Sequence, residues 1–176
     1  RLSNEDALTG LQNRRGLQSY VADRSDPAAP AAARTVMMLD IDCFKNYNDA
    51  YGHVMGDAAL AAIAEELERT ARPYGATAFR YGGEEFLVLA EGQTLSAARQ
   101  TAQGILEAVA SRRIEFEGGI GGVLTVSIGM FYTESPERAL APDIDRADAA
   151  LYAAKANGRN QVVVRLGLSG ADAGAG

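Results

Sequence analysis

Apolar residues recur along this chain with two different spacings, which separate the expected helices from the expected strands. Spacings of three and four residues predict amphipathic helices, and three long segments show them: residues 57–72, 94–112 and 143–157. A shorter helix is expected after Asn13, whose side chain can cap the first turn. Gly158 is expected to stop the last helix, because glycine readily adopts the conformation that ends one.

Strands are expected where apolar residues form a short continuous run or alternate with polar residues. Six segments meet this description: residues 36–40, 77–81, 86–90, 113–117, 124–130 and 162–164. The order of elements is then strand, helix, strand, hairpin turn, strand, helix, strand, with a further helix and strand at the end. We therefore predict an α+β fold of the ferredoxin-like split β-α-β-β-α-β type, with a mostly antiparallel central sheet flanked by helices.

Composition excludes several functions without changing this picture. A net charge of −6 argues against a general nucleic-acid binder, which normally carries a basic face. The apolar stretches are far shorter than the roughly 18 residues that a membrane span needs, and no secretory signal pattern opens the chain. One cysteine, Cys43, excludes an internal disulfide, and one histidine, His53, excludes a multi-histidine metal site.

A length of 176 residues suits one domain, expected over residues 1–166, followed by a disordered Gly/Ala-rich tail over residues 167–176. The chain begins at Arg1 without an initiator methionine, and we expect it to be a fragment of a longer, regulated protein. A cytoplasmic location and no membrane contact are expected for this domain, although the full-length protein could be membrane-anchored.

The segment Tyr81–Phe86 carries the strongest candidate chemistry. Gly82 and Gly83 lie between two expected strands and predict a tight hairpin turn, because glycine tolerates a positive φ. Glu84 and Glu85 place carboxylates at the tip, where bare backbone would let a phosphate ester approach. A solvated turn would explain the same residues, so the hypothesis of a metal–phosphate site depends on other segments.

The end of the first expected strand supplies one such segment. The fold places Asp40 beside the hairpin, and Mg²⁺ typically binds one or two carboxylates together with water and phosphates. The helix that follows exposes backbone amides that can hold phosphate oxygens, and Lys45 and Asn48 lie within it. Each residue also has an ordinary explanation: Asp42 could cap the helix, Lys45 could be solvated, and Asn48 could serve a turn.

Three further polar residues admit two interpretations. Asp57 could cap the helix that is expected to start there, or accept a hydrogen bond from the edge of a base. Lys155 and Arg159 could interact with the C-terminal dipole of the last helix, or hold a polyphosphate.

Five separated segments resemble, in order and spacing, the motifs of the GGDEF family, the bacterial diguanylate cyclase domains. They are DALTGLQNRR at residues 6–15, DIDCFKNYND at 40–49, GHVMGD at 52–57, RYGGEEF at 80–86 and ALYAAKANGRN at 150–160. The resemblance covers roughly residues 6–164, and the name motif has the GGEEF form.

The resemblance implies a palm domain like that of nucleotidyl cyclases, which joins two GTP molecules into cyclic di-GMP. Each subunit of a transient homodimer would present one GTP, and each 3′-hydroxyl would attack the α-phosphate of the other GTP and release pyrophosphate. The resemblance also implies Mg²⁺ or Mn²⁺ as cofactor, with two ions per GTP, and an upstream regulatory domain in the full-length protein.

The resemblance assigns the metal to Asp40, Glu84 and the carbonyl oxygen of Ile41. Asp40, Glu84 and Lys45 are its catalytic residues, with Lys45 stabilising charge on the phosphates. Glu84 could also accept the proton of the attacking hydroxyl, but a bound metal lowers the pKa of that hydroxyl, so we favour the ligand role.

The resemblance also implies a substrate-binding set: Phe44, Lys45, Asn48, His53, Asp57, Gly82, Gly83, Lys155 and Arg159. In it Asn48 and Asp57 read guanine, with His53 nearby. The two glycines let the backbone lie against the nucleotide, and Lys155 and Arg159 hold the β and γ phosphates.

Many family members carry an Arg-x-x-Asp motif upstream of the signature, which binds the product and inhibits. The corresponding residues here are Pro73–Ala76, with Arg72 displaced by one position, so we expect no allosteric product site.

Two rival hypotheses remain. One is a catalytically silent module that senses GTP or cyclic di-GMP, and the other is a related palm enzyme such as an adenylate cyclase, from which Asn48 and Asp57 would separate it.

Overall fold

The computed structural model describes residues 3–24 and 26–167 of the chain. Its helices are α1 (Arg14–Arg24), α2 (Phe44–Tyr51), α3 (His53–Ala71), α4 (Leu95–Ser111) and α5 (Ala141–Ala156). Its strands are β1 (Arg34–Ile41), β2 (Thr77–Arg80), β3 (Glu85–Glu91), β4 (Val126–Thr133) and β5 (Val162–Leu166). Apart from Gly167, the tail expected to be disordered lies outside the described residues.

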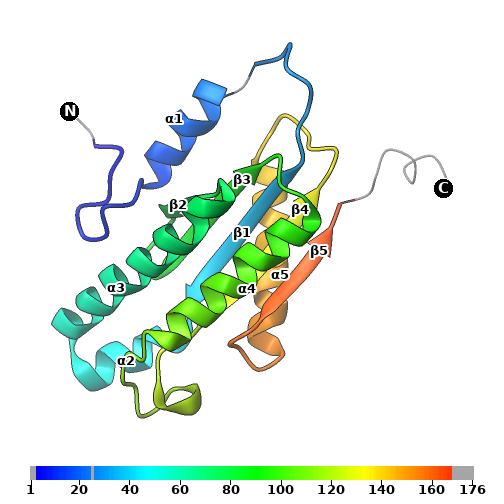
Figure 1. Cartoon of the computed structure of the whole chain (residues 1–176). Coiled ribbons are helices and arrows are strands. Elements are labelled where there is room, and N and C mark those ends of the chain that lie inside the picture. Colours follow the sequence, from blue (N-terminus) through cyan, green and yellow to red (C-terminus); the bar gives the residue numbers. More distant parts are fainter. Residues whose placement is uncertain (1–2, 25, 168–176) are drawn as a thin grey trace.

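The strands form one mixed sheet in the order β2-β3-β1-β4-β5 (Figure 1). The central strand β1 is antiparallel to β3 and β4, and β2 is antiparallel to β3. The appended strand β5 is parallel to β4 and is joined to it through α5. The predicted α+β fold with a mostly antiparallel sheet is confirmed, and β2, β3, β1 and β4 have the order expected of the split arrangement.

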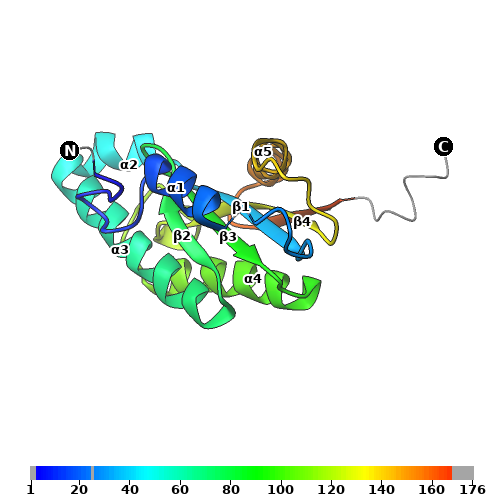
Figure 2. The same ribbon diagram turned by 90° about the horizontal axis from the view of Figure 1, so that it is seen from above.

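Helices cover both faces of the sheet, with α3 and α4 on one face and α1 and α5 on the other (Figure 2). Alternation along β1 divides its side chains between the two cores: Met37 and Leu39 pack toward α3 and α4, while Val36 and Met38 pack toward α1 and α5. A continuous apolar run is therefore required for β1, because neither of its faces meets water.

Gly129 in β4 allows α5 to pack unusually close to the sheet. A Cβ at this position would lie 2.1 Å from the backbone nitrogen of Leu151 and 2.2 Å from the carbonyl oxygen of Ala147, which no side chain tolerates. The close packing brings the C-terminal end of α5 over the C-terminal end of β1, where the candidate site lies.

The predicted helix cap is confirmed at α1 and wrong at α3. Asn13 caps α1 as predicted, because its side-chain oxygen accepts a hydrogen bond from the Gly16 amide at 2.9 Å. The interpretation of Asp57 as a helix cap is wrong, since α3 begins at His53 and Asp57 lies one turn inside it. The break between α2 and α3 falls at Gly52, whose φ of 87° suits glycine.

The strand expected over residues 113–117 is not formed. The structure has only an isolated bridge between Glu115 and Val123 there, within a glycine-rich loop. Alternating polarity was present, but backbone pairing is limited to this bridge and two hydrogen bonds beside it, from the Leu124 amide to the Ile114 carbonyl oxygen and from the Phe116 amide to the Gly122 carbonyl oxygen, both at 2.9 Å. Whether such a segment becomes a strand depends on pairing with distant strands, and the local sequence pattern does not reveal that pairing.

Candidate active site

Asp40 and Glu84 meet where the C-terminal end of β1 meets the hairpin between β2 and β3. Asp40 pairs with Glu85 in the β1–β3 register, and the Ile41 amide donates to the carbonyl oxygen of Glu84 at 3.4 Å. The prediction that the first strand adjoins the hairpin is therefore confirmed. Strand pairing fixes both backbones, so the two carboxylates are held near each other by the sheet.

Both carboxyl groups are poorly solvated and repel each other. Burial raises the pKa of Asp40 above its ordinary value, the ion pair with Lys155 opposes that rise, and the charge of Asp42 adds to it. Burial also raises the pKa of Glu84, and the negative charge of Asp40 raises it further. Two ionised carboxylates in this position favour a cation between them.

Lys155 on α5 supplies one cation, because its Nζ forms an ion pair with Oδ2 of Asp40. The other carboxylate oxygen, Oδ1 of Asp40, is buried and has no hydrogen-bond partner among the described residues. An unpartnered buried carboxylate oxygen is costly unless a ligand satisfies it.

The residues fit a Mg²⁺-like ion. The described residues contain no cluster of three or more His, Cys, Asp or Glu that could enclose a metal. Two carboxylates that supply hard oxygen ligands are nevertheless what Mg²⁺ takes from proteins, since water and phosphate oxygens complete its shell.

The hairpin differs from the prediction in its backbone conformation. The Tyr81 and Gly82 amides both donate to the carbonyl oxygen of Glu85, at 2.9 and 3.2 Å. Neither Gly82 nor Gly83 has a positive φ, so the conformational reason given for these glycines is wrong. A Cβ on Gly83 would meet nothing within 4 Å, and one on Gly82 would make only an ordinary contact with Glu85. None of the described residues therefore excludes side chains at these two positions.

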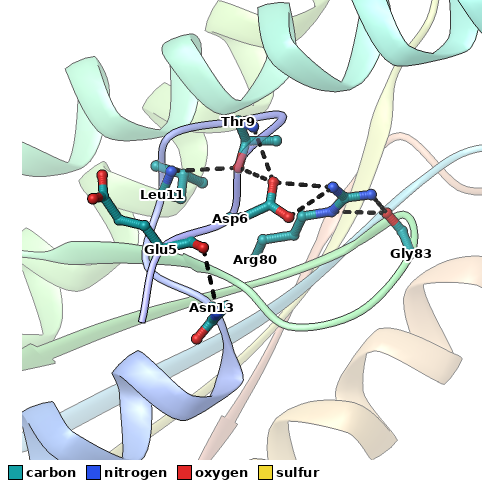
Figure 3. Close-up of polar contacts among 7 residues, drawn as sticks. All are labelled: Glu5, Asp6, Thr9, Leu11, Asn13, Arg80 and Gly83. Carbon is teal, nitrogen blue, oxygen red and sulfur yellow. Dashed lines mark hydrogen bonds and ion pairs between the residues drawn. The ribbon is translucent and has the colours of Figure 1, made fainter. Parts of the chain in front are cut away.

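Arg80 links the hairpin to a loop 74 residues away in sequence (Figure 3). Its Nη1 lies 3.0 Å from both carboxylate oxygens of Asp6, and its Nε and Nη2 donate to the carbonyl oxygen of Gly83 at 3.2 and 2.8 Å. Burial by itself would raise the pKa of Asp6, but hydrogen bonds from Thr9 and Arg80 outweigh burial and lower it. Sequence reasoning identified both motifs but missed this connection between them.

Asp42 does not cap α2. The N-cap position belongs to Cys43, and the Asp42 carboxylate turns inward instead, with 5% of the residue exposed. It accepts hydrogen bonds from the hydroxyls of Thr125 and Ser127, at 2.8 and 2.6 Å, and from the Asn160 amide at 3.1 Å.

The residues expected to read a base lie on α2 and α3. Asn48 is half-buried, and its Oδ1 has no partner among the described residues. Gly56 lies against it, because a Cβ on Gly56 would be 1.8 Å from that oxygen and 3.4 Å from Cζ of Phe44. His53 and Asp57 are exposed on the first turns of α3. Sequence reasoning missed Gly56, and its signal was a glycine inside a segment that otherwise favours a helix.

The remaining expected phosphate-binding cations are exposed. Lys45 lies on the first turn of α2 and forms no hydrogen bond or ion pair with another described residue. Arg159 follows α5, and its positive charge acts on Asp40 and lowers the pKa of that carboxyl. The structure thus brings Lys155 and Arg159 to the carboxylates.

The carboxylates of the buried Asp40 and the half-buried Glu84 do not line the larger hollows of the molecule. A hollow of about 510 Å³ is lined by residues such as Phe131 and Arg146, beside the far half of β4. Another, of about 390 Å³, adjoins the hairpin next to Arg14 and Tyr81. Neither contains the carboxylate pair, so chemistry and not cavity size locates the site.

The family described as "Diguanylate cyclase, GGDEF domain" matches residues 3–161. The chain belongs to the GGDEF family. The diguanylate cyclase VdcA of Vibrio cholerae is 38% identical over 160 residues, which cover 90% of this chain and 46% of VdcA. The cyclic di-GMP phosphodiesterase PdeR of Escherichia coli is 36% identical over 169 residues, which cover 93% of this chain and 24% of PdeR.

Solved GGDEF domains share the fold. The GGDEF domain of DgcB from Caulobacter crescentus, in complex with c-di-GMP, has a TM-score of 0.79 and 32% sequence identity, covering 93% of this chain and 96% of that one. The chain spans less than half the length of VdcA and of PdeR, which are therefore larger proteins. No helix of this GGDEF domain, within the residues that the structure describes, is long and apolar enough to cross a membrane.

In this GGDEF domain residues 72–76, directly before β2, contain no aspartate. Arg72 lies in a short 3-10 helix, Arg72–Tyr74, and its Nη2 pairs with Glu68 at 3.0 Å. The position that an Arg-x-x-Asp motif would give to aspartate is Ala76, which is buried.

Proposed function

We propose that this GGEEF-type domain is a diguanylate cyclase that condenses two GTP molecules into cyclic di-GMP and two pyrophosphates. The observation that carries the proposal is the pair of desolvated carboxylates, Asp40 and Glu84, at adjoining strand ends beside bare hairpin backbone. Membership of the GGDEF family supports the same reaction. A cytoplasmic location, where GTP is available, remains a prediction.

Asp40, Glu84 and the carbonyl oxygen of Ile41 would hold Mg²⁺ or Mn²⁺. A divalent ion bound there would neutralise phosphate charge and lower the pKa of the attacking 3′-hydroxyl. The unpartnered Oδ1 of Asp40 supports this assignment, because it is a buried ligand atom without a donor. Glu84 serves as a ligand, since a carboxylate that holds a cation is a weak base.

Lys155 and Arg159 would bind the β and γ phosphates of GTP, and Lys45 would stabilise charge that develops during transfer. Lys155 already neutralises Asp40, which keeps its ammonium group at the site before substrate arrives. Arg159 can offer two parallel hydrogen bonds to a phosphate group.

Asn48 and Asp57 would select guanine, with Phe44 and His53 beside the base. A site that hydrogen-bonds the edge of a base discriminates strongly, because the wrong base leaves buried polar groups without partners. One such site per chain holds one GTP, so the reaction needs two chains that face each other in a transient homodimer. Gly82 and Gly83 leave the hairpin backbone open to the nucleotide.

A second candidate function is a catalytically silent domain that senses GTP or cyclic di-GMP. The similarity to PdeR is the reason to consider this function. PdeR contains a segment similar to this chain, yet it is named a cyclic di-GMP phosphodiesterase and not a cyclase. Retention of both acidic residues, both glycines and the two phosphate-binding cations favours the cyclase. Regulation by a further domain is proposed from the greater length of the relatives.

Incubation of the protein with GTP and Mg²⁺, followed by identification of the product by mass, tests the proposal. Formation of cyclic di-GMP that is lost in Asp40→Asn supports it. Binding of GTP without any turnover, at protein concentrations high enough for dimers, would favour the sensing function. Turnover of ATP at the same rate as GTP would favour the related palm enzyme.

A further inference from the structure

We propose that Asp42 is a positioning residue for Arg159, which it holds at the phosphate-binding end of the site through the loop between α5 and β5. The inference rests on the phosphate role proposed above for Arg159. Asp42 itself is buried, with 5% of the residue exposed.

Asp42 is the point where three parts of the fold meet. Its backbone amide donates to the carbonyl oxygen of Thr125 at 2.9 Å, and its carboxylate accepts from the hydroxyls of Thr125 and Ser127 at the start of β4. The same carboxylate accepts from the backbone amide of Asn160 at 3.1 Å. The end of β1, the start of β4 and the α5–β5 loop are thereby fixed relative to one another.

The loop that carries Arg159 has an unfavourable backbone. Arg159 and Asn160 have φ values of 63° and 46°, in the left-handed region that side chains other than glycine rarely adopt. Such conformations persist only where surrounding contacts determine them, and they concentrate at functional sites. The contact at Asn160 is a hydrogen bond to a buried carboxylate, which is stronger than one between neutral groups.

Gln161 braces the same loop from its other side. Its side-chain amide donates to the carbonyl oxygens of Asn157 and Arg159, at 3.0 and 3.1 Å. Gln161 is nevertheless exposed to solvent at these bonds, whereas the Asp42 carboxylate is buried and serves three donors at once. Loss of Asp42 therefore leaves Asn160 without its acceptor and frees the loop to relax from the left-handed conformation.

A purely structural role is the alternative, and Asp143 provides the matched control. Asp143 is also buried, with 2% exposed, and its carboxylate binds Arg34 and Arg146 at 3.1 and 2.8 Å. It lies in the first turn of α5, at the opposite end of that helix from Lys155. Asp143→Ala should lower stability as a buried ion-pair loss does, without reaching the phosphate-binding loop.

The test compares the affinities for 3′-deoxy-GTP and 3′-deoxy-GMP in the presence of Mg²⁺. Both lack the attacking hydroxyl, so no turnover occurs, and they differ only in the β and γ phosphates. The ratio of the affinity for 3′-deoxy-GTP to the affinity for 3′-deoxy-GMP reports contacts to those two phosphates. Partial unfolding removes binding of both nucleotides equally, so the ratio does not respond to lost stability alone.

We expect Arg159→Ala to lower this ratio about tenfold or more, as loss of charge-assisted hydrogen bonds does. Asp42→Ala should lower it to a similar extent, and the double variant should fall no further, because both changes remove the same contact. Asp143→Ala should keep the wild-type ratio. If Asp42→Ala does not fold, Asp42→Asn keeps the volume but weakens the bond to Asn160, and it should lower the ratio less.

The test distinguishes failure of the Asp42 inference from failure of the proposed role of Arg159. If Arg159→Ala lowers the ratio while every folded Asp42 variant keeps the wild-type ratio, the phosphate role of Arg159 stands and the positioning role of Asp42 is overturned. If Arg159→Ala keeps the ratio, the phosphate role is wrong and the inference is overturned with it. An equal fall in Asp143→Ala would show that loss of a buried carboxylate far from the loop also lowers the ratio, and the specific positioning role of Asp42 would be overturned.

Discussion

Gly56→Ala is expected to disable guanine recognition while leaving the fold intact. The added Cβ would lie 1.8 Å from Oδ1 and 3.0 Å from Cγ of Asn48, so the Asn48 side chain must leave its position. Phe44 leaves the added Cβ little room, since its Cζ would be 3.4 Å from the same Cβ. The half-buried Asn48 can swing toward solvent, so the clash is relieved by moving the residue proposed to read the base.

The expected magnitudes have opposite signs for binding and stability. If Asn48 makes two hydrogen bonds to guanine, their loss weakens GTP use by about 1–3 kcal/mol, which is about fivefold to 150-fold in kcat/KM. Alanine is preferred over glycine in a helix by up to about 1 kcal/mol, which offsets the strain of moving Asn48. The melting temperature should therefore stay the same or rise while activity falls.

The assay measures kcat/KM for GTP and ATP, together with the melting temperature, in Gly56→Ala, Asn48→Ala and Gly104→Ala. Gly104 lies in α4, where an added Cβ would be 3.1 Å from a methyl group of Thr70, so this control gains helix preference away from the site. Asn48→Ala and Gly56→Ala should lose GTP preference alike, and Gly104→Ala should keep it. Wild-type selectivity in Gly56→Ala, with selectivity lost in Asn48→Ala, would refute the geometric reasoning.

Three further outcomes are expected. Glu84→Gln should abolish cyclic di-GMP synthesis yet raise the melting temperature at neutral pH. Burial raises the pKa of Glu84, so the ionised carboxylate opposes folding. The stability that the protonated Glu84 contributes is present below the ordinary carboxyl pKa and is lost as pH rises through the raised pKa. Thermal melts from pH 4 to pH 8 check this, and a difference between variant and wild type that does not grow with pH would contradict it. Specific activity should rise with protein concentration over a hundredfold range, since each product needs two facing chains; flat activity without a stable dimer by light scattering would count against two half-sites. Cyclic di-GMP should not inhibit at saturating GTP, because Arg72 is paired with Glu68 and residues 73–76 contain no aspartate; strong inhibition that persists at saturating GTP would mean that another surface binds product.

Much of the fold could be predicted from the sequence because its signals are local. The buried run of β1, the capping asparagine before α1 and the periodic faces of α3 and α4 each depend on neighbours a few residues away. Boundaries were less well determined. α3 starts four residues before Asp57 because the chain turns at Gly52, and residues 113–117 found no strand to pair with.

The candidate site divides in the same way. The motifs and the proximity of Asp40 to the hairpin followed from element order, since the topology of the split arrangement makes those strands neighbours. The reason given for Gly82 and Gly83 was wrong, because the turn at the hairpin does not use positive φ. Residue type alone could not separate a glycine needed for its conformation from one that leaves space open.

The sequence by itself determined most of the elements that form, their order, and the family to which the chain belongs. Only the tertiary structure decided which side chains meet: Arg80 with Asp6 across 74 residues, Lys155 with Asp40, and the inward carboxylate of Asp42 with Asn160. The physical reason is that helix and strand preferences arise from contacts within a few residues. The partner of a polar side chain is instead set by how sheet register and helix packing bring distant backbones together.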